Sequence, residues 1–226
     1  PGVTLGHGLI VDRYSNMLRY PSVRQTGLEL ACNFGGWGFE LLTGNVNRAD
    51  IVGGRAFIRP LFGTGIPVVR NLGFGISAVT DQNPNADING DQVTVVGADI
   101  DLPVVNWPVF SLLVFADAAQ MRVGDFYKSP RTALVAGTLT DYPVGVIDNG
   151  VGMAAGMQGK ILQVFDYRAE YRKIENSFIP GYFGPFYDAE RSYKGNILPP
   201  VGTPSTVKEG PLAAGALNLL NLVRFS

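Results

Sequence analysis

The chain has 226 residues, of which 46% are hydrophobic and only 16% charged, with 29 glycines and a formal net charge of −1. An ordinary soluble domain carries roughly 25% charged residues, yet the chain is too apolar for intrinsic disorder. The near balance of 18 basic and 19 acidic residues argues against a surface that binds nucleic acid through excess positive charge. A single cysteine, Cys32, and a single histidine, His7, exclude an intramolecular disulfide and a Cys/His zinc site.

No helix is predicted to cross or enter a membrane. The N-terminus has no basic region followed by an apolar run, so no signal peptide is expected in these residues. The longest uncharged stretch, residues 102–116, holds two prolines and is shorter than the ~20 residues that a spanning helix needs. The apolar surface of the chain must therefore be covered by a core, a partner or lipid contacted through other elements.

Alternation with a period of two predicts strands along most of the chain. Segment 27–43 alternates on both sides of a turn-like stretch at 33–36, which is a hairpin signature. The same alternation occurs in segments 5–11, 52–61, 72–79, 93–101, 110–120, 151–158 and 165–172. Segment 110–120 also suits a helix and is interpreted as a strand. With a possible final strand within 217–225, the count is roughly eight to twelve short strands.

The clearest strand is FDYRAEYR at 165–172. Its aromatic and small side chains fall on one side, and Asp166, Arg168, Glu170 and Arg172 fall on the other. A helix would scatter these charges around its circumference. In a strand they form a ladder of alternating sign, with ~7 Å between successive charges.

The two faces of the strands distinguish two all-β architectures. A soluble sandwich places Lys, Glu, Thr and Ser on its outward face, whereas here the second face carries mainly Gly, Ala and Ser with sparse charges. An outer-membrane barrel has an apolar face toward lipid and a polar or small interior. We therefore expect an antiparallel up-and-down transmembrane β-barrel of roughly 8–12 strands, either complete or part of a larger barrel. The alternative is a soluble β-sandwich or jelly-roll that assembles through its apolar faces.

This interpretation divides the chain into a barrel domain, residues 1–195, and a tail, residues 196–226. The first part of the tail is rich in Pro, Gly and Thr and is expected to be a loop. Beyond it, the sequence favours either a helix opened by Pro211 over 212–223 or the C-terminal strand within 217–225.

A network of charged side chains is expected on the inner face of the barrel. Its members are Glu29, Glu40, Arg55, Arg59, Asp99, Asp101, Asp166, Arg168, Glu170 and Arg172. The four arginines among them either select anionic solutes in a pore or neutralise the carboxylates beside them. The sequence alone does not separate these two roles.

One polar loop carries oxygen ligands of the kind that calcium prefers. They are Asp81, Asn83, Asn85, Asp87, Asn89 and Asp91. The spacing does not complete an EF-hand, because Val96 stands where the bidentate Glu is required. Solvated Asx turns explain the loop at least as well, so no metal is assigned and no cofactor is expected.

Other candidate sites favour structure over chemistry. His7 lies between two glycines without a Ser or Asp nearby in sequence, and the chain has no G-x-S-x-G motif. The glycines of segment 152–159 lack the strand, loop and helix order of a phosphate site, and fit close strand packing. The aromatic cluster of Phe178, Tyr182, Phe183, Phe186 and Tyr187 is expected to be part of an interfacial girdle or a folded surface loop rather than a ligand platform.

The runs GHGLIVDRYSN (6–16) and FDYRAEYR, followed by FIPGYFGPFYDAERS (178–192), together with the Gly/aromatic hairpins, resemble a poorly characterised family of porin-like bacterial outer-membrane β-barrel proteins. The resemblance covers about residues 6–195 and lies in the general character of the sequence rather than in a catalytic motif. It implies a closed antiparallel barrel in a bacterial outer membrane, exported with a signal peptide. The usual terminal aromatic is displaced here, since Ser226 follows Phe225.

The function expected from this resemblance and from the strand faces is a porin-like channel or a structural membrane component, not an enzyme. Its partners would be the lipid bilayer and either further copies of itself or a larger membrane complex, without nucleic acid.

Overall fold

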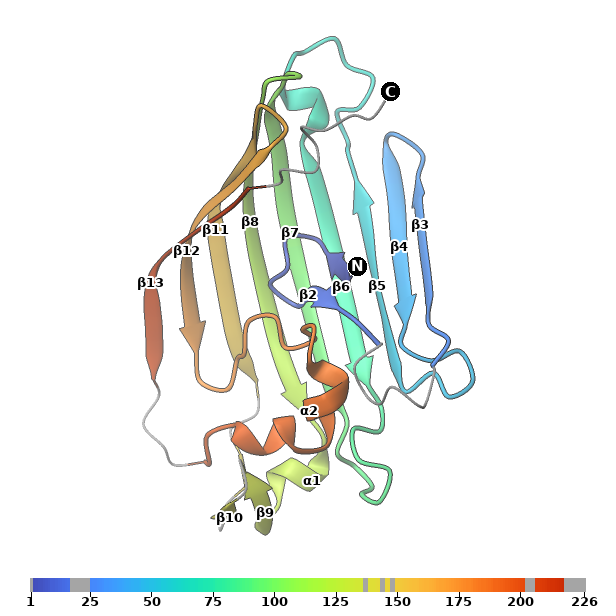
Figure 1. Ribbon diagram of the computed structural model, residues 1–226, viewed down its shortest axis with the longest axis vertical. Coiled ribbons are helices and arrows are strands. Elements are labelled where there is room, and N and C mark those ends of the chain that lie inside the picture. The colour runs from blue at the N-terminus through green and yellow to red at the C-terminus, as the bar shows by residue number, and fades with distance from the viewer. Residues whose placement is uncertain are drawn as a thin grey trace.

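A computed structural model describes residues 2–16, 25–135, 138–142, 145–146, 149–201 and 206–217. The protein is all-β, with 55% strand and 9% helix, and one large antiparallel sheet dominates it (Figure 1). Its nine strands are β3 (Leu28–Asn33), β4 (Trp37–Thr43), β5 (Ile51–Ile58), β6 (Gly73–Asp81), β7 (Val93–Asn106), β8 (Phe110–Val123), β11 (Gly150–Ile161), β12 (Phe165–Glu175) and β13 (Val207–Leu217).

The strands follow one another across the sheet in chain order, so the topology is up-and-down. The remaining elements are the hairpins β1 (Val3–Leu5) with β2 (Val11–Tyr14) and β9 (Arg131–Val135) with β10 (Thr138–Tyr142), and the helices α1 (Asp125–Lys128) and α2 (Tyr187–Lys194). Short 3-10 turns occupy Val69–Asn71 and Gly195–Ile197. The sandwich or jelly-roll alternative predicts two stacked sheets, whereas the structure has one large sheet in chain order. Within the described residues this sheet is not closed, because β3 and β13 are its edges.

The connections at the two ends of the sheet differ in length. Three links at one end are tight turns of three residues, 34–36, 107–109 and 162–164, and the link 59–72 is longer. We call this the hairpin end. At the opposite end, the loop end, the links are 44–50, 82–92, 124–149 and 176–206, and the last two contain the helices.

The predicted strand at 5–11 is wrong. Leu5 ends β1 and Val11 begins β2, and the residues between them turn the chain. Gly6 and Gly8 cause this reversal, since both have positive φ angles, 56° and 84°, in the region that glycine adopts most readily. The strand interpretation of 110–120 is confirmed by β8.

In the tail, the helix alternative is wrong for residues 212–217, which belong to β13. Pro211 lies opposite Tyr171 in this strand and is tolerated there because β13 is an edge strand. The possible strand at 217–225 lies outside the described residues except for Leu217. β13 pairs with β12 throughout its length, so the sheet extends past residue 195 into the tail.

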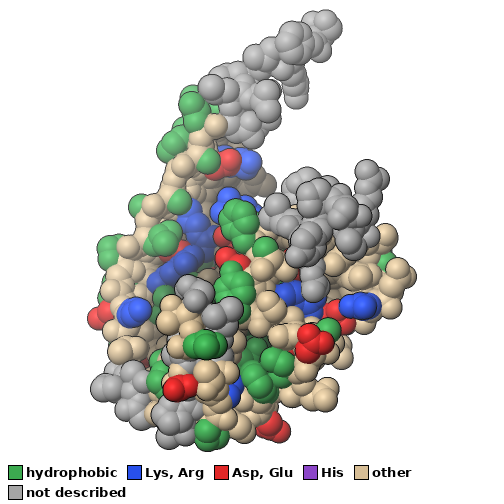
Figure 2. Space-filling view, turned by 60° about the horizontal axis from the view of Figure 1, so that its bottom comes forward, with side chains coloured by type: hydrophobic (Ala, Val, Ile, Leu, Met, Phe, Trp, Pro, Cys, Tyr) green, Lys and Arg blue, Asp and Glu red, His purple; other side chains and the backbone are tan. Residues whose placement is uncertain are grey.

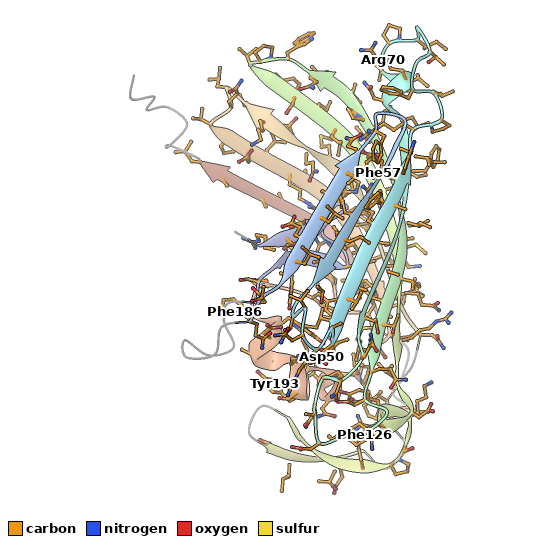
Figure 3. All side chains as sticks on the ribbon, turned by 90° about the vertical axis from the view of Figure 1, so that its right-hand side faces the viewer. Asp50, Phe57, Arg70, Phe126, Phe186 and Tyr193 are labelled. Carbon is orange, nitrogen blue, oxygen red and sulfur yellow. The ribbon has the colours of Figure 1, made fainter. Side chains whose placement is uncertain are left out.

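The hydrophobic core lies on the concave face of the sheet, beneath the β1–β2 hairpin and α2 (Figure 1, Figure 3). Small residues make room for these elements. A Cβ at Gly97 would lie 2.8 Å from Ile10, and one at Gly152 would lie 2.2 Å from the Phe178 ring. The chain therefore fills part of the hollow of its own sheet with the N-terminal hairpin and with the segment around α2.

The convex face, by contrast, exposes apolar side chains across the whole sheet. The strand register aligns one cross-strand row of Trp37, Ile58, Phe74, Ile100, Ala116, Ala155, Tyr171 and Pro211. This row contains no charged residue, and its large members are exposed. Among the described residues, neither helix is long and apolar enough to cross a bilayer.

Candidate functional site

The ten residues of the expected charged network lie on, or next to, the concave face. Nine of them occupy inward positions of β3, β4, β5, β7 and β12, as the register of the sheet shows. The tenth, Arg59, follows β5 and stacks on the Phe57 ring at 4.7 Å. The structure gathers most of the network into two groups on this one face, the first on β4, β5 and β7 and the second on β12.

The first group is centred on Arg55, whose side chain is buried. Its guanidinium binds the Asp99 carboxylate through Nε at 2.9 Å and through a second nitrogen at 2.5 Å, and Glu40 lies 3.8 Å away. Arg55 and Asp99 reach each other across Gly75 of the strand between them, where a Cβ would lie 2.4 Å from an Asp99 oxygen. Two carboxylates face this one arginine, so Arg55 is neutralised.

The second group is the ladder on β12. Both Arg168 and Arg172 bind Glu170, with closest nitrogen–oxygen distances of 2.6 Å and 2.5 Å. The Glu170 side chain is completely buried, while the two arginines keep about a quarter of their side-chain surface exposed. Two guanidinium groups share one carboxylate here, so this group carries an excess positive charge.

The remaining members have weaker partners. Asp166 pairs with Lys160 at 3.1 Å in an exposed position. Arg59 donates hydrogen bonds to the Asn33 side chain and to the Gly35 carbonyl. Glu29 and Asp101 have no ion partner among the described residues.

A buried contact between His7 and Asp117 was not predicted from the sequence. His7 Nδ1 lies 2.8 Å from an Asp117 oxygen, and its ring stacks on Phe115 at a centroid distance of 4.4 Å. Ser77 lines the small cavity beside them, which at about 20 Å³ has room for little more than a water. The contact attaches the N-terminal hairpin to β8, and only its two flanking glycines hinted that His7 approaches another segment closely.

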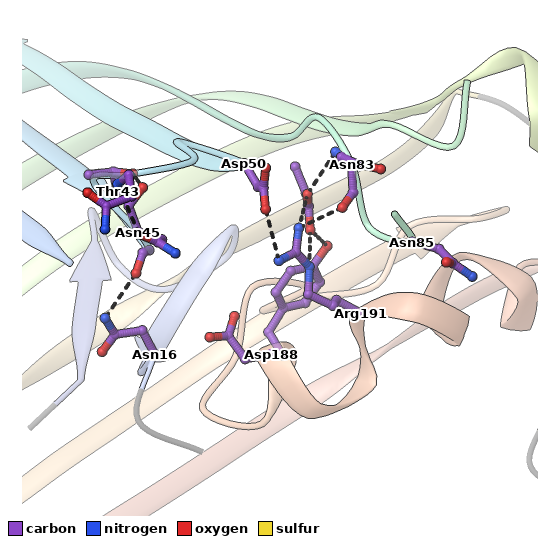
Figure 4. A network of polar contacts seen from close by, with 12 residues as sticks. Asn16, Thr43, Asn45, Asp50, Asn83, Asn85, Asp188 and Arg191 are labelled. Atoms are coloured by element: carbon purple, nitrogen blue, oxygen red, sulfur yellow. Dashed lines mark hydrogen bonds and ion pairs between the residues drawn. The ribbon is translucent and has the colours of Figure 1, made fainter. Parts of the chain in front are cut away.

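A second buried network joins α2 to the loop end of the sheet (Figure 4). Arg191 donates to both Asp81 oxygens, at 2.9 and 2.6 Å, and to the Asn83 carbonyl, and it lies 3.7 Å from Asp50. The Tyr187 hydroxyl donates to Asp81 at 2.9 Å. Burial raises the pKa of Tyr187 well above its ordinary value. The network thus fixes α2 across the hollow.

The same contacts engage side chains of the candidate calcium loop. Both Asp81 oxygens are held by Arg191, and the Asn83 amide donates to Asp81. The Asp87 amide donates to the Asn85 side chain, and the Asn85 amide donates to Asp91. Asp87 and Asn89 are exposed, and in the described part of the chain no three His, Cys, Asp or Glu side chains converge to hold a metal ion. The loop is organised by Asx turns, as the alternative interpretation predicted.

The aromatic cluster is not an interfacial girdle or a surface loop. Phe178, Tyr182, Phe183 and Tyr187 are buried in the core, and only Phe186 is exposed. Phe178 packs against β11, where Gly150 and Gly152 leave room for it. Exposed aromatic residues gather instead at the hairpin end of the sheet, namely Phe34, Trp37, Phe62, Trp107 and Phe165. Four of them lie in or directly beside the three tight turns, and Phe62 lies in the longer link 59–72.

A cavity of about 720 Å³, which we call the β12 cavity, lies on the concave face between the N-terminal hairpin and strands β8 and β11–β13, and its lining is both charged and apolar. Its charged lining consists of Asp12, Arg13, Lys160, Asp166, Arg168 and Arg172. Figure 2 shows basic side chains gathered in the hollow of the molecule. No protein-family model, curated protein sequence or solved structure gives a significant match to this chain.

Proposed function

We propose that this chain forms the wall of a bacterial outer-membrane β-barrel, with its convex face in contact with lipid. The observation that carries this proposal is the uncharged outward row that runs from Trp37 on β4 to Pro211 on β13. A monomeric soluble protein rarely exposes a continuous apolar patch larger than a few hundred Å². The concave apolar face is covered by the chain itself, so lipid is the natural cover for the convex one.

The uncharged outward residues of the convex face form a belt that shifts along the strands from β3 to β13, and this shift supports a membrane location. In the cross-strand row that begins at Leu28 on β3, the outward residue on β8 is Arg122. The next row begins at Leu30 and carries Glu175 on β12, and the row after it begins at Cys32 and carries Lys173 on β12 and Glu209 on β13. The belt therefore moves toward the hairpin end from β3 to β13. Barrel strands tilt by roughly 35–45°, and a level membrane would cross tilted strands with this kind of stagger.

Strand and loop lengths fit the same proposal. Strands β7 and β8 have 14 residues, β11 has 12, β12 and β13 have 11 each and β6 has 9, against the roughly 9–11 that a tilted spanning strand needs. Strands β3, β4 and β5, with 6, 7 and 8 residues, are shorter than this range. Outer-membrane barrels combine short turns on the periplasmic side with longer loops outside and aromatic residues at the interfaces. The hairpin end, with its tight turns and exposed aromatics, would then face the periplasm.

Closure of the barrel needs strands beyond the nine described. Because nine consecutive antiparallel strands alternate in direction, the edges β3 and β13 run the same way. Antiparallel closure therefore requires an odd number of further strands between them, which fits membership of a larger barrel.

The elements that fill the concave side of the sheet favour one kind of membrane function over another. The β1–β2 hairpin and α2 occupy the concave face, held by the His7–Asp117 and Arg191–Asp81 contacts. A barrel filled in this way supports a structural component or a narrow, plugged passage acting without chemistry, rather than a wide open pore.

Heat-modifiable migration tests the proposal. Protein folded into neutral detergent or lipid vesicles is run on an SDS gel with and without boiling, and the unboiled sample should migrate differently because a lipid-embedded barrel resists SDS at room temperature. A stable, soluble monomer obtained in buffer without detergent would contradict the proposal. A large soluble assembly without lipid affinity would support the alternative function as a structural subunit.

A further inference from the structure

We infer that the β12 cavity is a binding site for a small organic carboxylate, held by Arg168 and Arg172. The inference goes beyond the proposed function, because it concerns a ligand and rests on the cavity rather than on lipid contact. The cavity volume of about 720 Å³ lies in the range of roughly 300–1,000 Å³ that is usual for small-molecule sites.

Charge balance distinguishes this site from the Arg55 group. Arg55 faces both Asp99 and Glu40, whereas Arg168 and Arg172 share Glu170 alone. The other charges of the cavity cancel in pairs, since Lys160 binds Asp166 and Arg13 lies 3.6 Å from Asp12. One positive charge therefore remains, at the two arginines, and it matches a ligand with one negative charge.

The strands on both sides of β12 offer no further carboxylate to these arginines. On β11 the inward residues opposite Arg168 and Arg172 are Gln158 and Ala154. On β13 they are Ala214 and Gly210. The neighbours are neutral or small, so a ligand can reach the guanidinium groups from the cavity.

The two arginines present their exposed surface to this cavity. Both line it and keep about a quarter of their side-chain surface exposed. A carboxylate is the acceptor whose two oxygens match the planar guanidinium. Leu212, Ala214 and Ala216 supply an apolar wall in the same cavity. Together these features favour a carboxylate with a compact apolar body.

Benzoate is a suitable probe, and benzamide is its neutral counterpart of the same shape. The full chain in neutral detergent is titrated with each compound by isothermal calorimetry at constant ionic strength. We expect saturable binding of one benzoate per chain and no detectable binding of benzamide. Equal binding of the two compounds, or none of either, would overturn the inference without any variant being needed.

Variants then locate the site. R168Q and R172Q should each weaken benzoate binding by about tenfold or more, because a charged hydrogen bond is lost. E170Q should strengthen binding, since it frees both guanidinium groups. R122Q, on the convex face, is the matched control and should leave binding unchanged. Retained binding in R168Q and R172Q would refute the assignment. Heat-modifiable migration of the same samples reports separately on the membrane proposal.

Discussion

Arg191 connects three separate parts of the chain at a single side chain. Its guanidinium contacts Asp81 at the end of β6, the Asn83 carbonyl in the following loop, and Asp50 beside β5. Arg191 and Asp81 are both buried. Removing either one therefore leaves the other as a buried charge without its counter-ion, and this sets the cost to stability.

R191Q should destabilise the protein by about 3–5 kcal/mol, because it leaves the Asp81 carboxylate buried without its counter-ion. Chemical unfolding followed by tryptophan fluorescence measures the change. R122Q removes an exposed arginine that contacts only Gln120 among the described residues, and it should change stability by less than about 0.5 kcal/mol. Similar losses in the two variants would contradict this account of α2.

Asp91 should make stability depend on pH. Burial raises the pKa of this carboxyl to about 6, despite the hydrogen bond that it accepts from the Asn85 amide. The folded protein therefore holds this proton more tightly than the unfolded chain, whose carboxyl titrates near pH 4. The stabilisation from Asp91 is full below pH 4 and is lost as the pH rises toward 6.

The comparison of wild type with D91N isolates this effect. The difference in free energy of unfolding between them should change by roughly 2–3 kcal/mol between pH 4 and pH 7, with the wild type relatively more stable at the acidic end. D125N, which alters an exposed carboxyl of α1, should show no such trend. A pH-independent difference for D91N would show that Asp91 titrates normally.

Among the elements, strand β11 shows how glycine positions the interior. The Phe178 ring lies directly over Gly152, and the chain leading to α2 follows from there. Gly210 on β13 faces the same side of the sheet but has nothing within 4 Å of its Cβ position. The two glycines thus differ in what surrounds them rather than in backbone conformation.

G152A should therefore destabilise the fold by about 1–3 kcal/mol through overpacking, whereas G210A should have an effect close to zero. Unfolding midpoints of the two variants give the comparison. An equal effect at both positions would mean that strand propensity, and not the contact with the Phe178 ring, determines the effect of G152A on stability.

The strands were predictable because each face of the sheet has its own environment. Alternation is a local property, and it correctly placed Arg168, Glu170 and Arg172 on one face together. Which charges pair was not predictable, since the contact of Arg55 with Asp99 depends on the register of three strands. The position of α2 also depends on long-range packing, through Arg191 and Asp81. The aromatic cluster around Tyr182 was misassigned for the same reason.

At the scale of the whole molecule, the convex face should respond to charge as a lipid-facing surface. I76R places an arginine in the middle of this face, where the side chain is 67% exposed. In vesicles it should cost about 2–4 kcal/mol near the bilayer centre. L139R, at a residue that is 74% exposed on the β9–β10 hairpin, should cost almost nothing. Equal tolerance of both substitutions would argue that water, not lipid, covers the convex face.

The most direct test of the central claim uses the two tryptophans, Trp37 and Trp107, both exposed at the hairpin end. Their fluorescence is measured in vesicles made with lipids brominated at defined depths along the acyl chains. We predict strong quenching by bromines near the interface, weaker quenching by bromines near the bilayer centre, and protection from aqueous acrylamide. Quenching by acrylamide with no effect of any brominated lipid would contradict a membrane location for this sheet.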